Sequence, residues 1–76
     1  MQRYRNLGGN SGVVAFEHSK NSIKVRFHDG SEYLYDIQSA GSGNILQMIA
    51  LAERGWGLNS FISRHVKKGY AARLYG

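Results

Sequence analysis

The stretch that decides the fold is IKVRFHDGSEYLY, residues 23–35. Apolar and polar side chains alternate on both sides of Asp29-Gly30, a pattern typical of a β-hairpin. Side chains point to the two faces of a strand in turn, so a slip of one residue moves every side chain of that strand to the opposite face. The length of the loop therefore decides which face of the hairpin is buried.

Two loop lengths compete. A two-residue loop, Asp29-Gly30, would gather the basic side chains of the first strand beside Tyr33 and Tyr35, a platform typical of domains that stack nucleic-acid bases. A three-residue loop, residues 28–30, instead pairs Val25 with Tyr33 and Ile23 with Tyr35. Every large apolar side chain of the hairpin except Leu34 then lies on one face.

The energy of burial favours the three-residue loop. Each large side chain that leaves water contributes about 1.5–3 kcal/mol, and this register also places Arg26 opposite Glu32 on the outer face, a pair worth less than about 1 kcal/mol. The loop is expected to be a type I turn followed by Gly30 in the left-handed region. The expected core of the hairpin is Ile23, Val25, Phe27, Tyr33 and Tyr35.

The hairpin is expected to belong to a three-stranded meander. Residues 13–17 are β-branched and aromatic and predict a first strand, with the hairpin strands at approximately 22–28 and 31–37. Residues 1–12 contain three glycines and no periodicity, which predicts a flexible basic N-terminal arm with little to bury. Residues 13–76 then form a single domain.

Two helices are predicted after the meander. Apolar residues at i, i+3, i+4 and i+7 indicate helices over about 43–54 and 60–68. Ser42 or Asn44 is expected to cap the first helix and Asn59 the second, with Gly55 and Gly69 at the C-terminal ends. Residues 70–76 fit either a docked extended segment or a frayed end. The expected fold class is α+β, with the antiparallel meander packed against two C-terminal helices.

Composition bounds the class of protein. The chain has 76 residues, a formal net charge of +5 and no cysteine, so disulfides, thiolate metal sites and thiol nucleophiles are excluded. A chain without cysteine fits a reducing compartment, and no apolar run resembles a signal peptide or a membrane span. We therefore expect a cytoplasmic protein that does not bind membranes.

From Ser11 to Tyr70 the chain resembles the KTSC domain, a module found at the C-terminus of some lysyl-tRNA synthetases. Residues 11–17 are similar to its opening strand, and Ile23-x-Val25-x-Phe27-x-x-Gly30-x-x-Tyr33-x-Tyr35 is similar to its central hairpin. Residues 61–70 resemble its closing element, although Ser63 replaces the family's Asn and residues 40–43 lack its Pro-Pro pair. The resemblance implies an α+β fold and an RNA-binding or accessory role.

Basic residues dominate the C-terminal third, where no acid follows residue 53. Arg64, Lys67 and Lys68 are spaced i, i+3, i+4, which predicts a basic ridge on one face of the second helix. Such a ridge fits phosphate binding, and it equally fits a solvated helix face with cations near the C-terminal dipole. The candidate nucleic-acid-binding residues are Arg54, Arg64, His65, Lys67, Lys68, Tyr70 and Arg73.

Other classes of function find little support. The three histidines lack the spacing of a local metal motif, and no paired carboxylates or nucleophile motif suggest catalysis, so we expect no enzyme, metal, cofactor or small-molecule substrate. Nucleic acid, with RNA favoured, is the leading partner. The alternative is a protein-interaction or homodimerisation module that uses Leu34, Trp56 and Tyr75 as an apolar patch.

Overall fold

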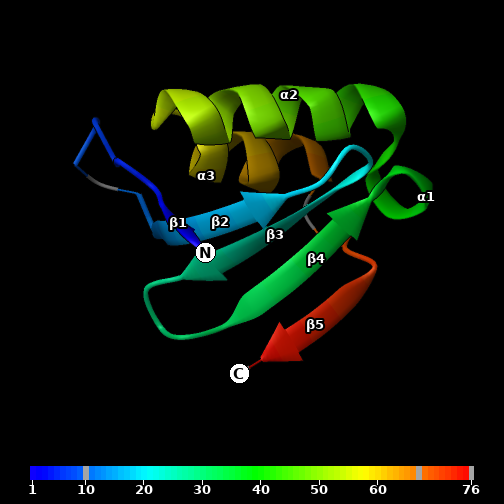
Figure 1. Cartoon of the computed structure of the whole chain (residues 1–76), viewed down its shortest axis with the longest axis horizontal. Helices are drawn as coiled ribbons and strands as arrows, with labels where there is room; N and C mark the ends of the chain where they lie inside the picture. The colour runs from blue at the N-terminus through cyan, green and yellow to red at the C-terminus, as the bar shows by residue number, and fades with distance from the viewer. Residues whose placement is uncertain (10, 67, 76) are drawn as a thin grey trace.

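The fold is α+β, with one antiparallel sheet that carries the longest helix and the helical segment after it on one face, while a short helix follows the end of one strand (Figure 1). A computed structural model describes residues 1–9, 11–66 and 68–75. Five strands follow one another across the sheet in chain order, so each strand pairs with its sequence neighbour. The strands are β1 (Gln2–Arg3), β2 (Val13–His18), β3 (Ser22–Phe27), β4 (Glu32–Asp36) and β5 (Ala72–Tyr75).

The central hairpin has the predicted register. Ile23 lies opposite Tyr35, Val25 opposite Tyr33 and Arg26 opposite Glu32. Phe27 N donates to Ser31 O at 2.9 Å across the three-residue loop, and Gly30 has a φ of +91°, in the region that only glycine adopts easily. The platform expected from a two-residue loop is therefore absent, and Tyr35 lies beneath the helices.

The prediction of three strands is incomplete, because a short strand extends the meander at each edge. β1 pairs with β2, and β5 returns after the helices to pair with β4. β5 shows that residues 72–75 form a docked extended segment, one of the two alternatives for residues 70–76. Both edge strands are short and largely exposed.

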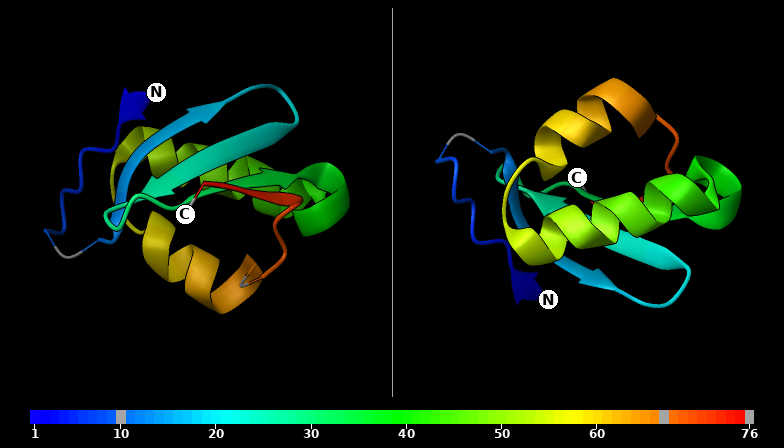
Figure 2. Two further views of the ribbon diagram at one scale, coloured as in Figure 1. Left: turned by 90° about the horizontal axis from the view of Figure 1, so that it is seen from below. Right: turned by 90° about the horizontal axis from the view of Figure 1, so that it is seen from above.

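The helices differ from the prediction mainly at their ends. They are α1 (Ile37–Ala40), α2 (Ser42–Arg54), α3 (Leu58–Phe61) and the π-helix η1 (Ile62–Val66). α1 lies between the predicted last strand and the predicted first helix, and it forms because the Asp36 carboxylate accepts from Ser39 N at 2.8 Å in a capping box. Figure 2 shows α2 beside the continuous α3–η1 segment, both on one face of the sheet.

The predicted side-chain caps are wrong. Gly41 precedes α2 and Gly57 precedes α3, so Ser42, Asn44 and Asn59 all lie inside helices. Asn44 instead donates from Nδ2 to Ala40 O at 2.8 Å, back to the preceding turn. The expected C-terminal glycine of α2 is confirmed, because Gly55 adopts a left-handed φ of +78°.

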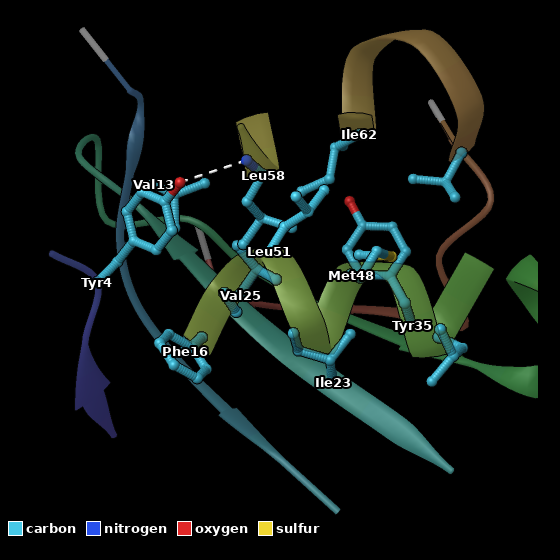
Figure 3. Close-up of a cluster of buried hydrophobic side chains, with 13 residues drawn as sticks. Tyr4, Val13, Phe16, Ile23, Val25, Tyr35, Met48, Leu51, Leu58 and Ile62 are labelled. Atoms are coloured by element: carbon cyan, nitrogen blue, oxygen red, sulfur yellow. Dashed lines mark hydrogen bonds between the residues drawn. The ribbon is translucent and has the colours of Figure 1, made fainter. Parts of the chain in front are cut away.

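One core fills the space between the sheet and the helices (Figure 3). Ile23, Val25 and Tyr35 are buried in it as expected, while Phe27 and Tyr33 are half-buried at its border. Tyr4 corrects the expectation that residues 1–12 have little to bury, since only 3% of it is exposed. Its hydroxyl accepts from Leu58 N at 3.3 Å, which ties the N-terminal segment to the start of α3 (Figure 3).

Candidate nucleic-acid interface

The candidate cations of the second helix do not share one helical face. η1 ends at Val66, two residues before the predicted end, so Lys68 lies beyond the helix. Arg64 and His65 occupy η1 and are exposed, whereas Lys67 falls outside the described residues. The expected ridge is therefore not a single helical face, since Arg64 lies on η1 and Lys68 after it.

Arg64 and His65 line a surface cavity of about 500 Å³. Trp56 and Phe61 form the aromatic part of its wall, and Asn6 contributes from the N-terminal segment. Phe61 and His65 are four residues apart and their rings stack, with centroids 4.6 Å apart and planes inclined by 32°. Cationic, polar and aromatic side chains thus line the same cavity.

Trp56 is held in position although 53% of it is exposed. The Arg54 guanidinium lies over the indole, 5.5 Å from the ring centroid, in a cation–π contact. On the side of the N-terminal segment, Gly8 approaches so closely that a Cβ there would lie 3.2 Å from Trp56 Nε1. The indole is therefore an ordered part of the wall, and Arg54 belongs to the same site.

The N-terminal segment forms the opposite wall of the cavity. Leu7 N donates to Gly55 O at 2.8 Å, and Arg5 Nη2 donates to Glu53 O at 2.5 Å. Together with the bond between Tyr4 and Leu58, these contacts fasten residues 4–7 to the end of α2 and the start of α3. The predicted basic arm thus helps to build the site through its backbone and through Tyr4.

Tyr70 and Arg73 belong to a different cluster, centred on Tyr33. The Tyr70 ring lies 4.8 Å from that of Tyr33 and 6.3 Å from that of Tyr35, measured between centroids. Arg73 lies over the Tyr33 ring at 5.6 Å. Burial, and then the neighbouring Tyr33 and Tyr70, raise the pKa of Tyr35 to about 12. The half-buried Tyr70 therefore packs the sheet edge and does not line the cavity with Arg64.

The carboxylates of the chain are engaged away from the cavity. Asp29 accepts from both Ser31 N and Ser31 Oγ, which lowers its pKa, and Asp36 caps α1. Glu17 pairs with Lys24 and with the N-terminal amine, and Glu32 pairs with Arg26. The Glu53 carboxylate lies 2.8 Å from His18 Nε2. Across residues 1–9, 11–66 and 68–75, no carboxylate lies within ion-pair distance of Arg54, Arg64 or Lys68.

Sequence reasoning missed three parts of this site. The sequence assigned Trp56 only to a possible apolar patch and residues 4–8 to a flexible arm, and Phe61 was not among the candidate binding residues. A signal was nonetheless present for Trp56, because the cation Arg54 is only two residues before it. In the part of the chain that the structure describes, no three His, Asp or Glu side chains gather as a metal site would require.

No family model matches the chain, and no curated protein or solved structure matches it either. The KTSC resemblance thus rests on the residues quoted for it. Within the described ranges, no helix has the length and apolar character needed to cross a bilayer.

Proposed function

We propose that this chain is a small, non-catalytic accessory domain that binds nucleic acid, with RNA as the favoured ligand. The observation that carries the proposal is the group of cations beside the aromatic cavity. Arg54, Arg64 and Lys68 have no acidic partner in the described part of the chain, and two of them adjoin the cavity or its indole. Unpaired cations attract phosphates, and exposed aromatic rings stack bases.

The KTSC resemblance supports the same proposal independently, because it implies an RNA-binding or accessory role. The cysteine-free composition fits the cytoplasm, where we place the protein. Arg54, Arg64, His65 and Lys68, together with the sequence neighbour Lys67, are the proposed phosphate-binding residues. Tyr70 and Arg73 bind a strand only if it extends from the cavity toward the sheet edge.

The test is association with labelled RNA, followed by fluorescence anisotropy. We expect binding at about 50 mM salt that weakens steeply by about 200 mM, since phosphate contacts release condensed counterions. A single-stranded DNA of the same sequence serves as the comparison for RNA preference. Absence of association with every RNA and DNA at low salt would refute the proposal.

A protein-interaction or homodimerisation module is the alternative function. The exposed residues Leu74 and Tyr75 favour it, because they lie on β5 at the edge of the sheet and are 43% and 69% exposed. An edge strand presents unpaired backbone groups to a partner strand. Such an interface survives high salt, so sedimentation at low and high salt separates the two functions.

A further inference from the structure

The cavity beside Trp56 adds more than positive charge to the proposed interface. Its volume of about 500 Å³ lies within the range of roughly 300–1,000 Å³ that is usual for sites that hold small organic groups. A flat basic patch would suffice to bind a phosphate backbone. The cavity therefore fits a ligand that has a bulky group able to enter it.

Ordered groups build the walls of the cavity. Residues 4–7 are fastened by Tyr4, Arg5 and Leu7. The Arg54 guanidinium lies over the indole, and Gly8 lies close to the Nε1 edge of the ring. Phe61, the last residue of α3, lies against His65 of η1. π-helical turns of this kind are rare and occur frequently at functional sites. The cavity is thus formed before any ligand arrives.

The chemistry of the walls matches the two halves of a nucleotide. Trp56, Phe61 and His65 offer ring surfaces, while Arg64 offers a guanidinium at the same place. Asn59 and Ser60 also line the cavity, and neither side chain makes a hydrogen bond with any other residue of the described ranges. Their polar atoms are free to meet the edge of a base.

We propose that the cavity receives one unstacked base of single-stranded RNA, against Trp56, with the adjoining phosphate on Arg64. This inference rests on the proposed function and adds selectivity for single strands. A duplex presents paired and stacked bases, and one of them would have to leave the stack before it could enter the cavity. Duplex RNA then meets only the surrounding cations.

The intrinsic fluorescence of the protein reports on the cavity directly, because Trp56 is the single tryptophan of the chain. We expect a short mixed-sequence RNA strand to quench this fluorescence saturably. The same strand annealed to its complement should bind through phosphates and leave the fluorescence nearly unchanged. Equal quenching by strand and duplex would overturn the inference.

A pair of serine variants tests the cavity without removing the probe. Ser60 and Ser63 are both exposed and lie in the same helical segment, but only Ser60 lines the cavity. Ser60→Leu should weaken binding of the single strand about tenfold, the loss expected for one stacked base, and should leave duplex binding unchanged. Ser63→Leu should leave both affinities unchanged.

Two substitutions of Trp56 provide a second test, measured by the anisotropy of labelled RNA. Trp56→Tyr keeps an aromatic ring at this position, and Trp56→Leu removes it. Tyrosine should retain most of the affinity for the single strand and leucine should lose about tenfold. If Ser60→Leu and Trp56→Leu both bind the single strand as tightly as the wild type, the base pocket is wrong while the proposed function stands. If no nucleic acid binds the wild-type protein, the proposed function fails and this inference fails with it.

Discussion

The outer face of the sheet and the cavity side of the molecule carry cations in two different ways. On the sheet, Lys24 lies 3.5 Å from Glu17, and Arg26 lies 2.6 Å from Glu32. Arg64, which lines the cavity, and Lys68, which follows η1, have no acidic partner within ion-pair distance in the described ranges. The same residue types therefore produce a nearly neutral surface on one side and a positive potential on the other, and net charge alone does not locate a binding face.

Reversing charge on each side tests this comparison and should give the largest effect. We expect Arg64→Glu with Lys68→Glu to weaken RNA binding about 100-fold at ~50 mM salt, because phosphate contacts are replaced by repulsion. Lys24→Glu with Arg26→Glu is the matched control, with the same change in net charge, and should weaken binding less. Thermal melts check that both variants fold, because Lys24→Glu and Arg26→Glu place like charges beside Glu17 and Glu32. A larger loss in the control would move the binding face to the sheet.

Tyr35, on the inner face of the sheet, should make the stability of the folded protein fall at alkaline pH. The pKa of Tyr35 is raised from 10.0 to about 12, so the folded protein holds a proton that the unfolded chain releases. The stabilisation is complete below pH 10 and is lost as the pH rises toward 12. Tyr35→Phe should reduce this loss by at most about 1.4 kcal/mol per pH unit, measured by urea unfolding.

Tyr75→Phe is the control for that measurement, because Tyr75 is 69% exposed and stays in water in both states. This substitution should leave the alkaline slope close to that of the wild type. An unchanged slope for Tyr35→Phe would mean that the buried hydroxyl does not govern alkaline unfolding.

The ion pair between Arg26 and Glu32 should give the smallest effect. Its guanidinium contacts the carboxylate through both Nε and Nη2, at 2.7 and 2.6 Å, but the Arg26 side chain is 46% exposed. A double-mutant cycle with Arg26→Ala and Glu32→Ala should give a coupling energy of about 0.2–1 kcal/mol, and salt should reduce it. A coupling above this range would show that the outer face stabilises the sheet more than an exposed pair can.

The central hairpin could be predicted because its register depends on many large side chains at once. A shift by one residue would expose either Ile23 and Val25 together or Tyr33 and Tyr35 together, so the sequence pattern has one favourable solution. The edge strands could not be predicted in the same way. Gln2, Arg3 and Leu74 are exposed, and their pairing is decided by backbone bonds that leave no apolar pattern.

The site was only partly predictable for a related reason. Arg54, Arg64 and His65 were found from their charge and spacing, but Tyr4 is flanked by two arginines and followed by glycines, with no periodicity to indicate burial. The π-helical turn left no signal either. In it Ile62 and Val66, four residues apart, are both buried, and the helix ends earlier than regular α-helical spacing indicates.

The position of β5 has a consequence for the order of folding. The strands from β1 to β4 pair with partners that are close in the sequence. β4 and β5 are separated in the sequence by all of the helices. Closing so long a loop costs more chain entropy than closing a hairpin turn, so we expect the β2–β3–β4 meander to form early and β5 to dock last. During synthesis, the meander and the helices leave the ribosome before β5 does, and the β4 edge of the sheet is then unpaired. A neighbouring nascent chain could pair with that edge before β5 docks.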